Sequence, residues 1–202
     1  RYSTDLGDPS NLMKIRKITC KKLKGGEVIC GAFYFGPQSF YNALNDMPEE
    51  ERMQFGMSGV NKVNQLYGDE MLKREQRQKG AFMNTCMMVT LSGAAISDGL
   101  DDGRVVSGVG GQYNFVAMAH ELEGARSILM LRSYRMVDGK PQSNIVTNYA
   151  HCTIPRHLRD IVITEYGIAD LRGKTDREVI EALLAIADSR FQEELLAWEV
   201  EH

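Results

Sequence analysis

The chain has 202 residues, of which 43% are hydrophobic, 25% charged and 8% aromatic. These values are ordinary for a globular protein and exclude a chain that is disordered throughout. Lysine and arginine total 24 and aspartate and glutamate total 27, so the net charge of −3 excludes the strongly basic character of a dedicated nucleic-acid-binding protein.

The first part of the chain is polar and basic. We expect residues 1–27 to be a loosely organised segment with a short strand around residues 15–20 and a turn at Gly25-Gly26. A folded domain is then expected over residues 28–200. It opens with an apolar, buried strand at residues 27–35.

Two prolines introduce the next two helices. Pro37 is followed by an apolar stripe of helical spacing, and Pro48 by three glutamates, which the helix dipole favours in a first turn. Residues 56–66 are compatible with a strand or a loop. Residues 69–79 are typical of a polar helix, with Gly80 as its C-cap.

The middle of the chain alternates between strand and helix patterns. We predict a central strand at 81–91, a strand or turn at 92–98, and a turn at 100–103. A short strand at 104–106, a glycine-rich bend and a helix at 113–122 follow.

Further strands are predicted beyond this helix, at residues 126–134, 143–148 and 160–164, with a hairpin loop at 138–141. Asn84, inside the predicted strand 81–91, is expected to find hydrogen-bond partners.

The last helices carry the strongest start signals. Thr175 with Glu178, and Ser189 with Gln192, are spaced as capping boxes, and each precedes an apolar stripe. Strands that alternate with helices predict an α/β domain with a mixed, largely parallel sheet flanked by helices.

The cysteines are expected to be free. Cys20, Cys30, Cys86 and Cys152 are far apart and form no C-x-x-C pair, which favours thiols in a reducing, cytoplasmic compartment over a zinc site or a disulfide framework. The sequence contains no apolar run long enough to span a membrane. We expect neither a membrane nor a nucleic acid as a partner, and no bound metal.

The sharpest candidate site is the bend Ser107-Gly-Val-Gly-Gly-Gln112. Glycines leave the backbone N–H groups open, and the start of the following helix favours negative charge, so the bend suits a phosphate or an oxyanion. The bend lacks the spacing of a dinucleotide fingerprint and the lysine of a P-loop. A tight turn that requires positive φ explains the glycines equally well.

Two further segments contain candidate ligand-binding side chains. In Thr153-Ile-Pro-Arg156-His157, an arginine and a histidine are suited to a phosphate or carboxylate; the alternative is an ordinary surface loop. In residues 164–173, Glu165 is a candidate acid/base or hydrogen-bond acceptor and Arg172 a candidate anion contact, because ligands bind beyond the carboxyl ends of strands. The alternative is a structural corner.

Taken in order, these motifs resemble a known family. The runs SGVGGQYNF at 107–115, SNIV at 143–146, TIPRH at 153–157 and ITEYGIADLRG at 163–173 are similar to the C-terminal domain of the acetyl-CoA hydrolase/CoA-transferase family. The runs GPQSFYNAL at 36–44 and NQLYGDE at 64–70 resemble its long bacterial branch. The resemblance covers about residues 28–196.

The resemblance implies a fold similar to the CoA-transferase/ribose-5-phosphate isomerase-like domain. It also implies that coenzyme A is moved between carboxylic acids, or that an acyl-CoA is hydrolysed, through a glutamyl-CoA thioester. Gly110 and Gly111 would then stabilise an oxyanion through their backbone amides. The cofactor-binding residues would be Gly108, Val109, Gln112, Arg156, Glu165 and Arg172.

The family's nucleophilic glutamate lies in a segment that resembles S-E-x-x-x-D-G, and this sequence does not contain it. We therefore expect the nucleophile on a missing N-terminal domain, in keeping with a chain that begins at Arg1, and little turnover by this piece alone. The alternatives are a non-catalytic module that binds coenzyme A or a nucleotide, and a sugar-phosphate isomerase-like enzyme. The acyl group, the choice between transferase and hydrolase, and a homodimer stay open.

Overall fold

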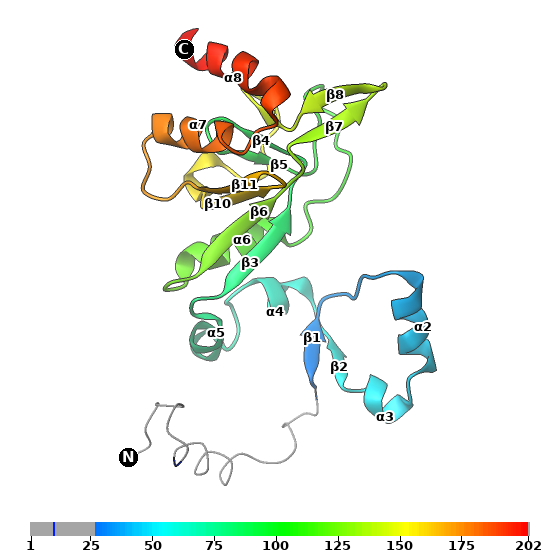
Figure 1. Ribbon diagram of the computed structural model, residues 1–202. Helices are drawn as coiled ribbons and strands as arrows, with labels where there is room; N and C mark the ends of the chain where they lie inside the picture. The colour runs from blue at the N-terminus through cyan, green and yellow to red at the C-terminus, as the bar shows by residue number, and fades with distance from the viewer. Residues whose placement is uncertain (1–9, 11–26, 202) are drawn as a thin grey trace. The chain divides into compact units, whose positions relative to one another are not determined.

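The computed structural model describes Ser10 and residues 27–201, with side chains to Trp198, and the chain divides into two compact units, residues 1–63 and 64–202 (Figure 1). The predicted leading segment, its strand around residues 15–20 and Cys20 lie outside the described residues, apart from Ser10 and Glu27. The three described cysteines, Cys30, Cys86 and Cys152, are free, as predicted.

The described part of the first unit contains a two-stranded parallel sheet, β1 (Ile29–Gly31) with β2 (Phe55–Met57), and two helices, α2 (Gln38–Asp46) and α3 (Glu49–Arg52). Both helices begin directly after the predicted prolines. Segment 56–66 is divided between β2, a short loop and α4 (Val60–Asn64).

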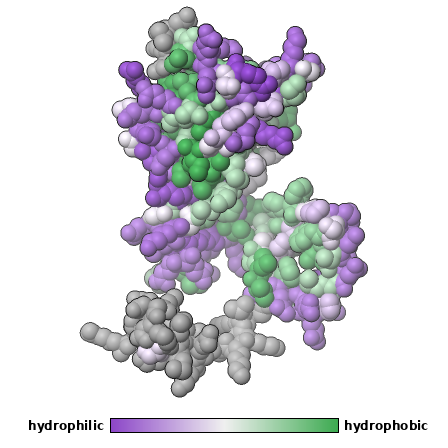
Figure 2. Space-filling model, viewed as in Figure 1, coloured by the Kyte–Doolittle hydropathy of each residue, from purple (hydrophilic) through white to green (hydrophobic). Residues whose placement is uncertain are grey.

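The prediction of a buried strand at residues 27–35 is wrong. Only three residues pair, and the side chains of Val28 and Phe35 are 63% and 89% exposed. A two-stranded sheet is too small to bury its own apolar side chains and needs a helix or further strands packed on it. Neither α2 nor α3 contains a buried residue. Figure 2 accordingly shows apolar side chains at the surface of this unit.

The second unit is built on a four-stranded sheet of order β11-β10-β6-β3. The strands β3 (Ala81–Thr85), β6 (Arg126–Met130) and β10 (Ile161–Thr164) run parallel, while β11 (Gly167–Asp170) is an antiparallel edge. The predicted α/β class with a mixed, largely parallel sheet is confirmed.

The predicted central strand at 81–91 is two strands in different sheets. The amide of Cys86 donates to Met130 of β6, but that of Met87 donates to Ile96, so the chain changes its pairing partner between these residues. The strand β3 is therefore an edge strand.

The Nδ2 of Asn84 has no partner among the described residues, contrary to expectation.

A three-stranded sheet packs beside the first, in the order β5-β4-β9: β5 (Ala95–Ile96), β4 (Met88–Thr90) and β9 (Ile145–Val146). The hairpin β7 (Tyr134–Val137) and β8 (Lys140–Ser143) turns at Asp138-Gly139, both with positive φ. The predicted strand at 104–106 is only an isolated bridge from Val105 to Gly99.

The helices of this unit are α5 (Glu70–Arg77), α6 (Gln112–Glu121), α7 (Asp176–Leu184) and α8 (Ser189–Glu201), with a 3₁₀ turn, η1, at Arg156–Leu158. The main core joins both sheets to the apolar faces of α6, α7 and α8. It consists of Val89, Leu91, Ala95, Val116, Leu129, Leu131, Ile145, Ile154, Val162, Ala169, Leu171, Val179, Leu183, Ile186, Ala187 and Leu195.

One of the two predicted capping boxes forms. Thr175 and Glu178 exchange side-chain-to-backbone hydrogen bonds at the start of α7. At α8, Gln192 instead donates to the carbonyls of Leu184 and Ala187, and the carboxylate of Asp188 accepts from the next turn. The predicted C-cap at Gly80 is also wrong, because Lys79 adopts the left-handed conformation after α5, with φ of 58°.

Candidate functional site

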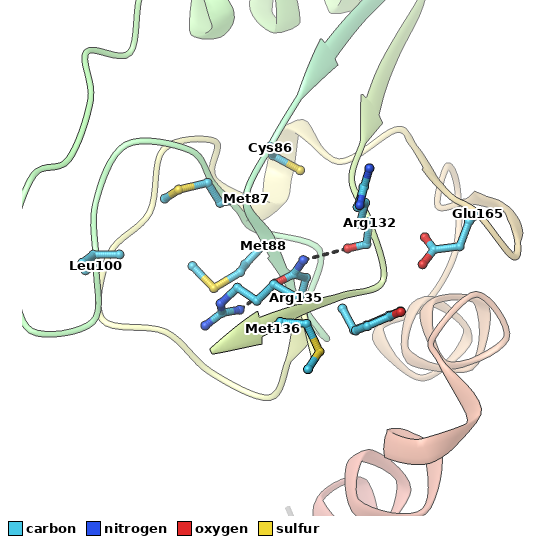
Figure 3. A pocket seen from close by; sticks show the side chains of 10 residues that line it. Cys86, Met87, Met88, Leu100, Arg132, Arg135, Met136 and Glu165 are labelled. Carbon is cyan, nitrogen blue, oxygen red and sulfur yellow. Dashed lines mark hydrogen bonds between the residues drawn. The ribbon is translucent and has the colours of Figure 1, made fainter. Parts of the chain in front are cut away.

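The parallel strands of the second unit end beside a cavity of about 1020 Å³ (Figure 3). One wall residue follows the carboxyl end of each strand: Cys86 after β3, Arg132 after β6 and Glu165 after β10. Ligands of open α/β sheets bind at this end of the strands. The other lining residues are Met87, Met88, Leu100, Tyr134, Arg135, Met136 and Asn144.

Most of the cavity wall is apolar. Met87, Met88, Met136 and Leu100 supply thioether and aliphatic surface, and Met88 is 3% exposed. Burial raises the pKa of the Cys86 thiol to about 12, so this side chain is a neutral thiol at physiological pH. The wall is therefore suited to an apolar group that can be surrounded by adaptable side chains.

Glu165 is fixed by hydrogen bonds at the edge of the cavity. Its carboxylate accepts from the backbone N–H and the hydroxyl of the fully buried Ser133, both at 2.8 Å. Partial burial alone raises its pKa, but the donors from Ser133 and its own backbone N–H outweigh that effect and lower it. Glu165 is thus an ionised hydrogen-bond acceptor at neutral pH.

Two arginines give the cavity positive charge. Arg135 donates to the Asn144 side-chain oxygen at 2.6 Å and to the side-chain oxygen of Gln142 at 3.2 Å, and both acceptors are neutral. The Asn144 amide in turn donates to the carbonyl of Arg132 at 2.9 Å (Figure 3). The Arg132 guanidinium has no hydrogen bond or ion pair with any described residue.

The glycine bend lies exposed at the start of α6. Gly110 has φ of 59°, and a Cβ at Gly108 or Gly110 would meet no atom within 4 Å. The backbone amides of residues 108–111 have no acceptor among the described residues. The bend is therefore an open row of N–H donors at a helix N-terminus, in addition to a turn that needs positive φ.

Side chains anchor this bend to the sheet. Gln112 is buried and its Nε2 donates to the carbonyl of Thr85 at 2.8 Å, and Asn64 donates to the carbonyl of Gly111 at 3.0 Å. The Thr85 carbonyl is at the end of β3, one residue before Cys86 of the cavity wall. The bend and the cavity therefore share the end of the same strand.

The residues before the bend are tied to the Thr153 segment. The backbone carbonyl of Asp98 accepts from the amides of Val106 and Ser107, while its carboxylate accepts from Thr153 and lies 3.0 Å from His151. The Thr153 hydroxyl and His151 lower the pKa of Asp98, against its burial. His151 thus has a structural partner, and the described residues contain no cluster of His, Cys, Asp or Glu suited to a metal ion.

Arg156 and Arg172 lie elsewhere. They line a depression of about 420 Å³ on the amino side of β10, because Arg172 follows the antiparallel strand β11. Arg156 pairs with Asp176 at 2.9 Å, and Arg172 pairs with Asp170 and, at 3.2 Å, with Asp160. The predicted site residues therefore form three groups: the bend, Glu165 at the cavity, and these two arginines.

Sequence reasoning missed the cavity residues Cys86, Arg132, Arg135 and Asn144 as members of a site. Cys86 and Arg132 were missed because the predicted strands at 81–91 and 126–134 continue through them, whereas β3 ends at Thr85 and β6 at Met130. For Arg135 and Asn144 no sequence signal was available, because the two side chains meet only when β7 and β8 pair as a hairpin.

Comparisons with known proteins identify the family of the chain. The family described as the acetyl-CoA hydrolase/transferase C-terminal domain matches residues 36–198. Among curated proteins, the 4-hydroxybutyrate coenzyme A transferase of Clostridium kluyveri is 30% identical over 184 residues, which are 87% of this chain and 38% of that protein. An acetyl-CoA hydrolase of Saccharomyces cerevisiae is 34% identical over 98 residues, 48% of this chain and 18% of its own length.

Solved structures show the same fold. RipA from Yersinia pestis has a TM-score of 0.67 and 26% identity, covering 94% of this chain and 41% of its own. The 4-hydroxybutyrate CoA-transferase of Porphyromonas gingivalis has a TM-score of 0.63 and 25% identity, covering 95% and 43%. This chain spans less than half the length of these relatives. Among the described residues, none of the helices combines the length and the hydropathy of a membrane-spanning segment.

Proposed function

Because the chain belongs to the acetyl-CoA hydrolase/transferase C-terminal domain family, we propose that it is the CoA-handling half of an acyl-CoA hydrolase or CoA-transferase. Its substrates would be an acyl-CoA and a carboxylate, in the cytoplasm and without a resident metal. The nucleophilic glutamate would lie in a segment outside these 202 residues, since the S-E-x-x-x-D-G pattern is absent from them. The chain's coverage of 38% of a curated relative leaves room for such a segment.

In this proposal, the glutamate carboxylate attacks the thioester carbonyl of the acyl-CoA. The C–S bond breaks, CoA leaves as a thiolate and an acyl-glutamyl anhydride forms. The thiolate then attacks the glutamyl carbonyl, which releases the first acid as a carboxylate and leaves a glutamyl-CoA thioester. A second carboxylate reverses these steps and leaves as its CoA ester, whereas water would release free CoA and return the glutamate.

The glycine bend supplies what this chemistry needs from the chain. Each attack places negative charge on a carbonyl oxygen, and the unbonded amides of Gly110 and Gly111 are suited to donate to it. Gly108 and Val109 keep the approach open, because the bend is exposed and a Cβ at Gly108 meets no atom within 4 Å. Gln112 positions the bend against β3.

The remaining predicted residues have narrower roles in the proposal. Glu165 is held by Ser133 and would accept a hydrogen bond from the ligand at the cavity edge. For Arg156 and Arg172 we propose an anion site in the 420 Å³ depression, where phosphates of CoA would compete with Asp176 and Asp170 for the guanidinium groups.

The observation that carries the proposal is the exposed row of unbonded amides, and a variant of Gly110 tests it. In the complete protein, Gly110→Val covers the amides and strains a backbone with φ of 59°, so transfer of CoA should fall at least about 100-fold. The matched control is Gly103→Val. Gly103 lies in an exposed turn with φ of 86°, and a Cβ there would meet no atom within 4 Å, so this variant has comparable backbone strain and should retain activity.

The 202-residue chain provides the second arm of the test. Calorimetric titration should detect CoA or acetyl-CoA binding that Gly110→Val weakens, with little or no turnover. Turnover by this chain that depends on one of its own glutamates would overturn the placement of the nucleophile. Binding of sugar phosphates in place of CoA would favour an isomerase-like function.

A further inference from the structure

We propose that the cavity at the carboxyl ends of β3, β6 and β10 binds the carboxylic acid substrate, with its apolar chain among the methionines and its carboxylate on Arg132. This inference rests on the proposed function and deepens it. It specifies a monocarboxylic acid with an aliphatic chain of several carbons, in preference to acetate or a dicarboxylic acid.

The size and lining of the cavity define the apolar part. Its volume of about 1020 Å³ is at the upper end of the range typical of small-molecule pockets, roughly 300–1,000 Å³, and far exceeds what acetate fills. Met88 is buried, Met87 and Cys86 are half-buried and Met136 is exposed, so the apolar lining extends from the interior to the surface. Methionine side chains adapt to the shape of a flexible chain, so acids of several lengths would fit.

The charge balance defines the polar end. The only carboxylate among the lining residues, that of Glu165, already accepts two hydrogen bonds from Ser133. Arg135 has neutral acceptors, and Arg132 has no partner among the described residues. The cavity therefore carries positive charge that an anionic ligand would neutralise.

The positions of the two arginines favour Arg132 as the contact. Arg135 donates to Asn144, whereas Arg132 is exposed and its guanidinium has no partner among the described residues that a ligand would have to replace. Because Arg132 is exposed, a carboxylate bound to it would be accessible to a thioester from solvent. A second carboxylate would have to draw Arg135 away from Asn144, or lie unpaired among the apolar side chains, where burying a charge is costly.

Binding of hexanoate to the 202-residue chain tests this assignment directly. An NMR titration should detect saturable hexanoate binding, with weaker binding of hexan-1-ol, acetate and adipate. Arg132→Gln should weaken hexanoate binding at least five-fold. The control Arg177→Gln, which removes an exposed arginine of α7 that pairs with Glu181, should leave it unchanged.

A second variant tests the cavity itself. Met136→Glu places a carboxylate in the cavity wall at an exposed position, so it should abolish hexanoate binding by repulsion without unfolding the chain. Equal hexanoate affinity in the wild type, Arg132→Gln and Met136→Glu, or no hexanoate binding at all, would overturn the proposal. If Arg132→Gln weakened binding of CoA or adenosine 3′,5′-bisphosphate and not of hexanoate, the anion would be a phosphate and the carboxylate assignment would be wrong.

The outcomes separate this inference from the proposed function. A complete protein that transfers CoA with the same KM for hexanoate in the wild type and Arg132→Gln would refute the cavity assignment alone. Hexanoate binding that depends on Arg132, in a complete protein that neither transfers CoA nor hydrolyses acyl-CoA, would refute the proposed function alone.

Discussion

The arginines beside the cavity and those at the opposite end of the four-stranded sheet differ in their partners. At the amino side of β10, Arg172 pairs with Asp170 and Asp160, and Arg156 and Arg159 both pair with Asp176. Of the arginines that line the cavity at the carboxyl side, Arg135 has only neutral acceptors and Arg132 has no partner among the described residues. The neighbouring Arg190, which lies over Tyr134, is paired with Asp188.

This difference distinguishes arginines that an anion would have to share with carboxylates from arginines that it would not. Ion pairs at the amino side connect β10, β11 and the start of α7, so their charge is already neutralised within the fold. The carboxyl side leaves guanidinium charge and backbone amides available beside a cavity. Both sides contain candidate anion contacts, but the arginines beside the cavity have no carboxylate partner that an anion would have to displace.

The largest loss of folding stability is expected when Asp160, the buried carboxylate at the amino side of the sheet, is replaced. Its Oδ2 accepts from the buried amide of Ser127 at 2.7 Å, and its Oδ1 faces Arg172. Asp160→Ala should lower the free energy of unfolding by about 3 kcal/mol, because a buried donor and an arginine lose their partner. Urea denaturation measures the loss. Asp160→Asn keeps an oxygen acceptor for Ser127 and should lose less. Equal losses for the two variants would contradict this, because they would show that the retained acceptor contributes nothing.

Replacing Ser133 should cause a smaller loss of folding stability, and the size of this loss should depend on pH. Ser133→Ala removes one donor to Glu165 and should cost about 1 kcal/mol at pH 7. Since the folded-state pKa of Glu165 is lowered, its stabilisation is present above the ordinary carboxyl pKa and is lost as the pH falls through the folded-state value. The difference between variant and wild type should therefore shrink in acid. A constant difference from pH 7 to pH 2 would contradict this account.

The start of α7 tests the amino side a second time. Thr175→Ala removes the observed cap and should cost about 1 kcal/mol. Ser189→Ala is the matched control, because the capping box predicted there is not formed. Urea denaturation of both variants should give a clearly larger loss for Thr175→Ala. The opposite order would mean that the hydrogen bonds at α8 differ from those described.

The smallest change in folding stability is expected when Arg132 is replaced. Because its guanidinium has no partner among the described residues, Arg132→Gln should change the free energy of unfolding by less than about 0.5 kcal/mol. Arg172→Gln, which breaks two ion pairs, should cost about 1 kcal/mol despite partial exposure. If the two losses were equal, the distinction between the two groups of arginines would not hold energetically.

Much of the fold was predictable from local signals. Proline positions located the starts of α2 and α3, the Asp138-Gly139 pair located the β7–β8 turn, and the Thr175 box located α7. Each signal acts within one turn of backbone, so no distant contact is needed. The break between β3 and β4 was missed, because an apolar run at 81–91 fits one long strand as well as two strands with different partners.

The candidate site was predictable only in part. The glycine bend is visible in the sequence, because three glycines in four residues indicate a backbone that turns sharply or stays open to a ligand. Grouping Arg172 with Glu165 was reasonable from their closeness in sequence. The antiparallel turn at β11 separates them, however, since it carries Arg172 back to the other end of the sheet.

The amino-acid sequence by itself determined the α/β class, the family, the bend and the residue types available for chemistry. The tertiary structure decided which of those residues meet. Ser133 finds Glu165 across 32 positions, and Ser127 finds Asp160 across 33. Whether a charge is paired depends on such long-range contacts, which no local pattern encodes, because strand order and direction set them only after the sheet has formed.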